Sequence, residues 1–221
     1  FGVNTYLNNL VEMQRRYSHS KEIPTISFRE PTTSESILAA SYDFGNMVKP
    51  QILDQRWLQI GRIVRTLEGV FVNPLKDSQG NPITDGKILE PFLYKAKKVK
   101  GIYLCENDFG FAPYESFTQG VQDCDTFAES GLARLLEHTE NKTARNLRKI
   151  ASPKFYKKGV NVSVFGFVKV KEPVLRVVGL RSYRDLDDYS LDVSGDYLDD
   201  DSEGCVFGVL DRTGEASTQT S

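Results

Sequence analysis

Apolar residues recur at a spacing near 3.6 between Val3 and Tyr17, which predicts a short amphipathic helix. An extended segment is expected over residues 23–30 and a second helix over residues 34–48. The apolar content of this region is too small for a core of its own. We therefore expect residues 1–50 to form an N-terminal arm or oligomerisation element that ends at Pro50.

The pattern changes to β-rich runs after Trp57. Strands are predicted over residues 58–65 and 70–72, because Leu67-Glu68-Gly69 between them has the composition of a hairpin turn. A helix over residues 52–64 is the competing interpretation, since its apolar residues also fit one helical face. We favour the hairpin.

The middle of the chain predicts a helix from Thr84 that ends in a lysine-rich stretch, where the side chains would interact with the helix dipole. These lysines are Lys95, Lys97, Lys98 and Lys100. A short strand follows over residues 101–105. The aromatic residues of the loop at 109–114 are expected to fill the core rather than to form a sugar-binding platform.

Thr126 and Glu129 have the spacing of a capping box and predict the start of another helix. A second helix is expected near residues 143–150. The remainder reads as strands over residues 160–168, 173–180 and 204–211, with a long irregular connection before the last one. Two helices between early and late strands indicate an α+β domain.

Residues 181–201, RSYRDLDDYSLDVSGDYLDDD, form a window of unusual composition. The window holds eight of the sixteen Asp and three of the ten Tyr, but no Lys, Glu, Gln, Met or Trp. Tyr, Arg, Ser and Gly are the residues that protein-binding loops favour. The leucines and valines within the window argue against plain disorder, although a solvated acidic loop is the alternative.

A single mechanism would produce this selection of residue types. Codons of the AAC or AAT type, randomised only at adenines, yield Asn, Asp, Tyr, Ser, Arg, Gly, Leu and Val, but none of the excluded types. Apolar and glycine positions bracket the window at residues 174–179 and 204–210. The pattern resembles the variable proteins of diversity-generating retroelements, such as phage tropism determinants and archaeal virus variable proteins.

The resemblance implies a C-type-lectin-like domain over residues 51–212, with two helices and a small, twisted, mostly antiparallel sheet. Its variable region would cover about residues 176–210, and residues 213–221 would form a disordered tail. Leu191, Val193 and Gly195 would point inward, and the residues that alternate with them outward. The chain begins with Phe rather than Met, so the sequence leaves open whether a leader precedes it.

The expected ligand-binding residues all belong to the window and would build one binding face, with the tyrosines and Arg184 as anchors and the acidic groups complementary to a basic partner. They are Ser182, Tyr183, Arg184, Asp185, Asp187, Asp188, Tyr189, Ser190, Asp192, Ser194, Asp196, Tyr197, Asp199, Asp200 and Asp201. The resemblance implies a protein ligand on a target cell or virion surface, display on a virion tail or cell surface, and leaves open a homo-oligomer.

We expect no enzymatic activity, no cofactor and no metal site. Only His19 and His138 could act as imidazole bases, and His138 reads as a helix C-terminal residue. Cys105, Cys124 and Cys205 lack the spacing of a zinc site and are expected to be free thiols, although one disulfide stays open. Asp199, Asp200 and Asp201 leave a calcium-dependent lectin or a metal-dependent hydrolase as alternatives.

The net charge and hydropathy of the whole chain argue against some classes of partner. A net charge of −2 predicts no footprint for nucleic acid or an anionic membrane, and no apolar run is long enough for membrane insertion. The sugar-binding tripeptide of C-type lectins is absent, which weighs against the lectin alternative. The formylglycine-generating branch of the same fold uses a cysteine pair, whereas only Cys205 lies in the C-terminal part of this chain.

Overall fold

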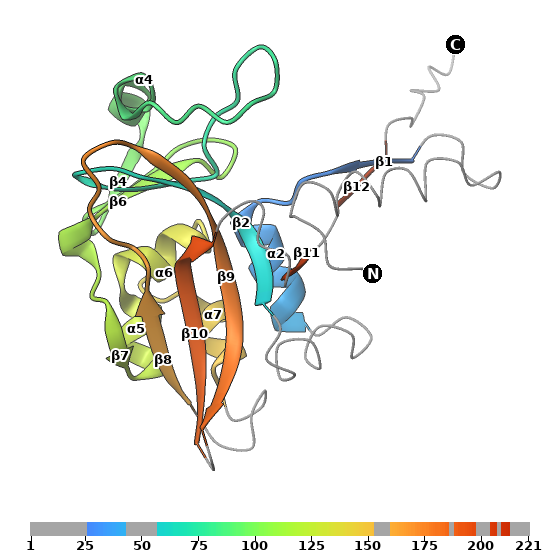
Figure 1. The fold of residues 1–221 in the computed structure, drawn as a ribbon, viewed down its shortest axis with the longest axis vertical. Coiled ribbons are helices and arrows are strands. Elements are labelled where there is room, and N and C mark those ends of the chain that lie inside the picture. The colour runs from blue at the N-terminus through green and yellow to red at the C-terminus, as the bar shows by residue number, and fades with distance from the viewer. Residues whose placement is uncertain are drawn as a thin grey trace, which may run out of the picture.

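A computed structural model describes residues 26–42, 57–152, 160–185, 188–197, 204–206 and 209–212. The helix expected over residues 3–17, the boundary at Pro50 and the tail after residue 212 lie outside these ranges. Within them the fold is mixed α+β, with a ten-stranded open sheet, a separate two-stranded ladder and a few short helices (Figure 1). The α+β class is therefore confirmed, but the sheet is larger than the small one that we expected.

The large sheet has the order β4-β5-β6-β3-β2-β9-β10-β8-β7, and β11 pairs with β2 off this path. Only the β8–β10 and β2–β11 pairs are parallel. The strands are β2 (Trp57–Arg65), β3 (Gly69–Val72), β4 (Lys97–Val99), β5 (Ile102–Leu104), β6 (Gly110–Pro113), β7 (Gly120–Gln122), β8 (Asn161–Phe165), β9 (Val174–Asp185), β10 (Asp188–Tyr197) and β11 (Gly204–Val206).

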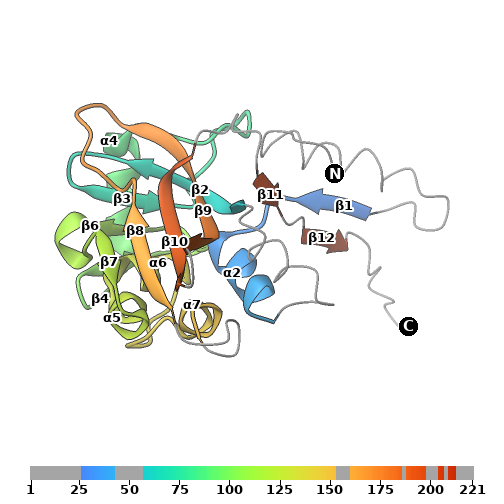
Figure 2. The ribbon, with the colours of Figure 1, turned by 60° about the horizontal axis from the view of Figure 1, so that its bottom comes forward.

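The β1 (Ile26–Arg29) and β12 (Val209–Arg212) strands pair antiparallel in the separate ladder, which lies apart from the large sheet (Figure 2). The expected extended segment near residue 26 and the last expected strand therefore exist. They pair with each other although they lie near opposite ends of the chain.

The hairpin expected after Trp57 is confirmed by β2 and β3, and the competing helix is wrong. All nine residues of β2 are buried, so both faces of the strand are covered, although Gln59, Arg62 and Arg65 are polar or charged. The turn is held by the Thr66 hydroxyl, which accepts hydrogen bonds from the backbone N–H of Glu68 and Gly69 at 3.2 Å each.

The helix that we expected to begin at Thr126 is two helices, α5 (Cys124–Glu129) and α6 (Gly131–Leu136). Asp123 caps α5, and its side chain accepts a hydrogen bond from the Thr126 N–H. The predicted capping box is therefore wrong. Ser130 has an extended backbone (ψ 156°) that interrupts the helix, and its hydroxyl caps α6.

The helix expected from Thr84 is also broken. It consists of α4 (Gly86–Leu89), capped by Asp85, and the 3-10 helix η2 (Glu90–Lys95), with Pro91 in the first turn. Lys97 and Lys98 lie on strand β4, and Lys100 lies in the following turn with a φ of 46°. These three lysines do not end a helix, so their expected interaction with a helix dipole is wrong.

Helix α2 (Thr33–Tyr42) begins one residue before the expected start at residue 34. Thr32 and Glu35 form a capping box: the Thr32 hydroxyl accepts from the Glu35 N–H, and the Thr32 N–H donates to the Glu35 carboxylate at 2.9 Å. Ile37 and Ala40 are fully buried in the main core. The described part of the expected N-terminal arm therefore packs on the same core as the sheet.

The main core lies between the sheet and the helices α2, α5, α6 and α7 (Arg145–Ile150), which cover one face of the sheet (Figures 1 and 2). A smaller cluster lies between the other face and α4, and it contains Phe71, Phe109 and Phe111. The expectation that the aromatic residues at 109–114 fill the core is confirmed for Phe109 and Phe111. Phe111 belongs to a strand rather than to the expected loop. A short 3-10 helix, η3 (Tyr114–Ser116), follows that strand.

Candidate functional site

The described residues of the window, 181–185 and 188–197, lie on two paired strands instead of the long irregular connection that we expected. Strands β9 and β10 pair antiparallel from Asp185 opposite Asp188 to Gly179 opposite Ser194. Strand β10 also pairs with β8 on its other side, so the second half of the window lies inside the sheet and not at its edge. Backbone pairing on both sides holds each residue of β10 in a fixed register.

The period-two alternation of β10 is confirmed, but the expected exposure of its outward residues is wrong at two positions. Leu191 and Val193 are fully buried on the helix-covered face. Asp192 and Ser194 point to the opposite face, which we call the front face, and yet they are only 6% and 1% exposed. Neighbouring strands therefore cover the front face at these positions.

Two large rings contribute to that cover. The register places Gly179 and Ser194 side by side on β9 and β10, between Gln59 on β2 and Phe165 on β8. The rings of Trp57 and Phe165 meet edge to face across these two strands, with 6.2 Å between their centroids. Because Gly179 has no side chain and Ser194 a small one, rings from the flanking strands can meet there.

A stack of cationic and aromatic side chains occupies the front face beside these rings. The Arg181 guanidinium carbon lies 4.4 Å from the Trp57 ring centroid and 5.8 Å from that of Tyr183. Trp57 is buried, whereas Tyr183 is 45% exposed. We define Trp57, Phe165, Arg181, Tyr183, Ser190 and Asp192 as the Arg181 cluster. The cluster is built from β2, β8, β9 and β10.

Asp192 fixes the position of Arg181. The Asp192 carboxylate accepts hydrogen bonds from the Arg181 guanidinium at 3.3 Å and from the Ser190 hydroxyl at 3.2 Å. Burial raises the pKa of Asp192 above its ordinary value, and the hydrogen bond from Arg181 acts in the opposite direction. Where Asp192 is ionised, the pair is neutral overall and partly withdrawn from water.

A second acidic residue of the window, Asp196, is also paired within the protein. Its carboxylate lies 2.9 Å from the Arg65 guanidinium and 3.3 Å from that of Arg176. Asp192 and Asp196 are the two acids of the window whose side chains the structure describes. Since both are matched by arginines, the expected attraction of a basic partner receives no support from them.

The structure separates other members of the predicted site. Ser182 is fully buried on the helix-covered face, opposite Leu191, and its hydroxyl has no hydrogen-bond partner among the described residues. Tyr189 packs against the main core. Tyr183, Ser190 and Asp192 remain together on the front face. The described part of the structure does not include Asp187, Asp199, Asp200 and Asp201, nor the side chains of Arg184, Asp185, Asp188 and Tyr197.

Sequence reasoning missed Trp57, Phe165, Arg65 and Arg176 as neighbours of the window. Trp57 is the single tryptophan of the chain, which is a weak signal for an aromatic anchor. No local pattern indicates that it lies beside Arg181, because the two residues meet only through the pairing of β2 with β9.

The described residues show little that resembles a catalytic or metal-binding centre. Within those ranges no three His, Cys, Asp or Glu residues gather as a metal site would require. Cys105, Cys124 and Cys205 form no disulfide, and burial raises the pKa of Cys105 and Cys124, which favours the unreactive thiol. His138 follows the last turn of α6, as we expected, and its Nδ1 lies 4.0 Å from the Asp108 carboxylate.

Among the helices that the structure describes, none is long and apolar enough to cross a membrane. Comparison of the chain with known protein families, with curated proteins and with solved structures finds no match. The function is therefore argued from the geometry of the front face.

Proposed function

We propose that this chain is a non-catalytic, hypervariable ligand-binding protein, similar to the variable proteins of diversity-generating retroelements with a C-type-lectin fold. Its binding surface is the front face of the β9–β10 hairpin, and its ligand is a protein on a target cell or virion surface. Display on a virion tail or a cell surface, as a single chain or an oligomer, belongs to the same proposal.

The observation that carries the proposal is the exposed ring of Tyr183 beside a partly buried stack. An aromatic anchor binds best when its position is fixed before the partner arrives, because less conformational entropy is then lost. Arg181 lies between Tyr183 and the buried Trp57 and is bonded to Asp192. Tyr183 therefore offers large contact area at a low entropic cost.

The arrangement of the hairpin supports rewriting of selected positions. Tyr183 and Ser190 project from the front face and are not fully buried, whereas Leu191 and Val193 on the same two strands fill the main core. Exchange of partly exposed side chains usually changes stability by less than about 0.5 kcal/mol, whereas exchange of core residues costs several times more. A diversified set can therefore coexist with a constant scaffold.

The neighbouring DNA provides the most direct test. We expect a near-copy of the 3′ coding segment that differs only at adenines, beside a reverse transcriptase gene. The adenine differences should fall in the codons for Tyr183 and Ser190 and should spare those for Leu191 and Val193. A genomic neighbourhood with neither element would refute the retroelement part of the proposal.

A protein-level test uses two matched libraries. One randomises Tyr183 and Ser190, and the other randomises Leu191 and Val193, with the folded fraction of each measured by protease resistance on a display platform. We expect most members of the first library and few of the second to fold. Equal tolerance in both libraries would contradict a constant scaffold with a variable face.

Calcium titration by calorimetry separates the proposal from a calcium-dependent lectin. We expect no calcium site with a dissociation constant below about millimolar, since Asp192 and Asp196 already form ion pairs with arginines. A micromolar calcium site would overturn the proposed protein-binding face in favour of the lectin.

A further inference from the structure

The segment from Lys87 to Lys100, KILEPFLYKAKKVK, has a charge that differs from that of the whole chain. It holds five lysines and one glutamate, whereas the chain has a net charge of −2. It forms α4, η2 and β4, and all five lysines are exposed. We call residues 87–100 the lysine end. The net charge therefore conceals a strongly basic local surface.

Large apolar side chains are exposed among these lysines. Ile88 is 51%, Phe92 48% and Tyr94 90% exposed, and no residue of η2 is buried. The segment is nevertheless anchored, because Leu89 is fully buried and the Phe92 ring lies edge to face with Phe109 at 6.4 Å. Large exposed apolar groups on a fixed segment are a feature of interaction surfaces.

The structure gives only part of these lysines a role inside the protein. Lys97 pairs with Glu140, and Lys98 lies over the Tyr103 ring at 5.2 Å. For Lys87, Lys95 and Lys100 the described residues show no ion pair. A helix dipole does not account for Lys100, which lies in a turn after β4.

We propose that the lysine end binds the surface of an anionic lipid bilayer, without insertion of a helix. Lysine ammonium groups would contact acidic headgroups while Ile88, Phe92 and Tyr94 enter the interface between headgroups and acyl chains. Aromatic residues are enriched at that interface, and basic residues beside exposed apolar groups are typical of segments that lie on membranes.

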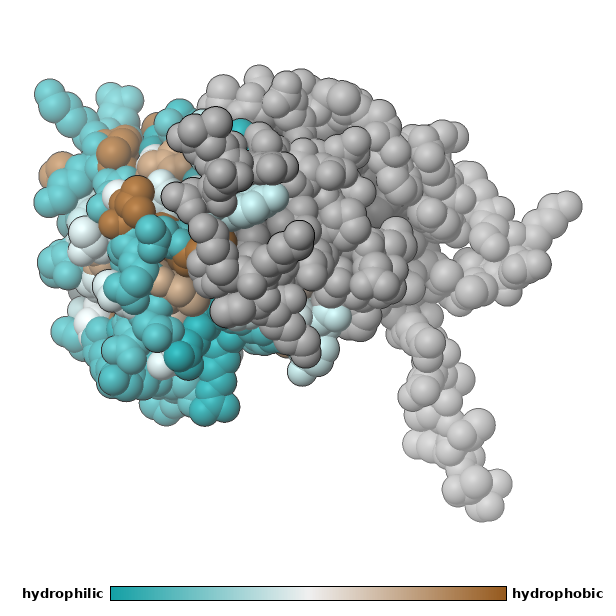
Figure 3. All heavy atoms as spheres, turned by 90° about the horizontal axis from the view of Figure 1, so that it is seen from below, coloured by the Kyte–Doolittle hydropathy of each residue, from teal (hydrophilic) through white to brown (hydrophobic). Residues whose placement is uncertain are grey.

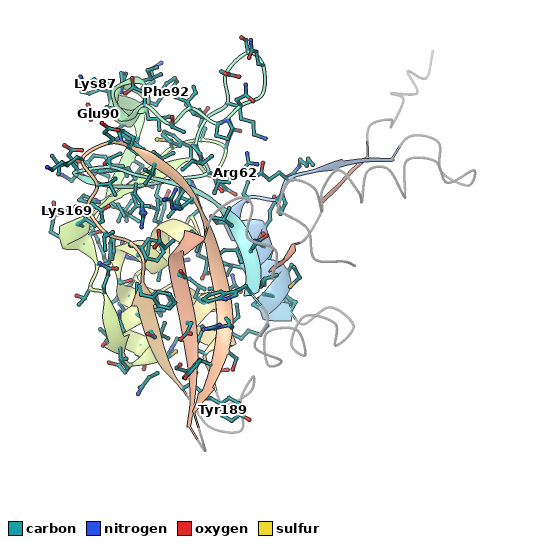
Figure 4. All side chains as sticks on the ribbon, in the orientation of Figure 1. Arg62, Lys87, Glu90, Phe92, Lys169 and Tyr189 are labelled. Atoms are coloured by element: carbon teal, nitrogen blue, oxygen red, sulfur yellow. The ribbon has the colours of Figure 1, made fainter. Side chains whose placement is uncertain are left out.

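The position of the lysine end fits this role. Lys87, Glu90 and Phe92 lie at one end of the molecule, and Tyr189 lies at the other, near the tip of the β9–β10 hairpin (Figure 4). Strand β9 alone has twelve residues and spans about 36 Å. This length exceeds the Debye length of about 8 Å at physiological salt, so charges near the hairpin tip would not cancel the attraction.

The underside of the molecule, near the hairpin tip, is mostly hydrophilic in its described part (Figure 3). A chain bound to lipid through the lysine end would therefore direct the hairpin away from the bilayer. This orientation is compatible with the proposed binding face, but the lipid contact uses different residues and stands without it.

Vesicle co-sedimentation tests the proposal, with phosphatidylcholine vesicles that contain phosphatidylserine compared with phosphatidylcholine alone. We expect binding only to the acidic vesicles and release at high salt. The triple variant Lys87→Gln, Lys95→Gln, Lys100→Gln should weaken binding by roughly 100-fold, since each lysine near an acidic surface contributes about fivefold. Phe92→Ser with Tyr94→Ser should weaken binding to the acidic vesicles at low salt, although it leaves the charge unchanged.

A matched control changes the net charge by the same amount elsewhere, with Lys142→Gln, Arg145→Gln and Lys149→Gln near and on α7. Binding by this control should equal that of the unchanged protein, and circular dichroism melting should confirm that every variant is folded. Equal losses in the two triple variants, or no binding of the unchanged protein to acidic vesicles, would overturn the proposal. Tyr183→Ala should retain vesicle binding even if the proposed protein ligand is wrong.

Discussion

The Arg181 guanidinium lies over the indole ring of Trp57, with 4.4 Å between its central carbon and the ring centroid. A cation over an aromatic face is stabilised by about 0.5–2 kcal/mol, and more when water is excluded. Trp57 is buried, so its ring is a fixed support. The exposed Tyr183 is thereby placed by residues that lie outside the set predicted to bind ligand.

Asp192→Asn removes a carboxyl whose pKa is raised by burial. Such a group binds more protons in the folded than in the unfolded state. Its contribution to stability is therefore full at low pH and is lost as the pH rises from the ordinary value of 3.8 through the raised pKa. We expect urea denaturation to show that Asp192→Asn gains stability relative to the unchanged protein between about pH 3.5 and about pH 7. If the free energy of unfolding of Asp192→Asn relative to the unchanged protein stayed constant or decreased with rising pH, the burial of this carboxyl would be contradicted.

Ser182→Ala should leave the protein equally stable or stabilise it by up to about 1 kcal/mol, because an unsatisfied buried hydroxyl is removed. Thermal melting provides the measurement. Ser190→Ala is the matched control, since its hydroxyl donates to Asp192, and it should cost about 0.5–1 kcal/mol. If Ser182→Ala were the more destabilising change, the position of Ser182 on the core face would be wrong.

Tyr183→Ala and Tyr189→Ala should differ although both residues were expected to be exposed anchors. Tyr183 is half exposed, so Tyr183→Ala should lower the free energy of unfolding by less than about 1 kcal/mol. Tyr189 packs against the main core, so Tyr189→Ala should lower the free energy of unfolding by about 2 kcal/mol. Both values can be measured from the midpoints of guanidinium denaturation, when the free energy of unfolding depends on denaturant with the same slope in every variant. Equal costs would indicate that the two rings have the same environment.

Gly195→Ala should destabilise the protein by about 1–3 kcal/mol, because overpacking forces neighbours to move. A Cβ at this position would lie 2.6 Å from ring atoms of Phe167, which is fully buried. Gly86→Ala is the control, since its Cβ would meet Thr66 at 3.4 Å and Phe71 at 4.0 Å, which are ordinary contact distances. Chemical denaturation of both variants is the measurement, and a neutral Gly195→Ala would show that the ring can shift.

Elements that depend on a local run of residues could be predicted from the sequence. The β2–β3 hairpin followed from two β-rich runs around a glycine turn, and the end of α7 from Pro153, which follows it in the sequence. The broken helices were missed because a single residue decides each break. Ser130 prefers to cap α6 rather than to continue α5, and Pro91 lacks the N–H that an α-helix requires.

The candidate site could be predicted only in part. Alternation along β10 correctly separates Leu191 from Asp192, because strand geometry fixes the side to which each residue points. Alternation does not show what lies above a residue. The cover of Ser194 and the support of Tyr183 come from strands β2 and β8, and their positions follow from pairings between distant parts of the chain.

Strand β10 lies between β9 and β8, so its register is fixed from both sides. Insertion or deletion of one codon in this strand would turn Leu191 and Val193 toward the front face and charged residues toward the helices. Any hereditary process that rewrites this hairpin must therefore conserve its length. Point exchange of nucleotides meets that condition, whereas recombination between segments of unequal size does not.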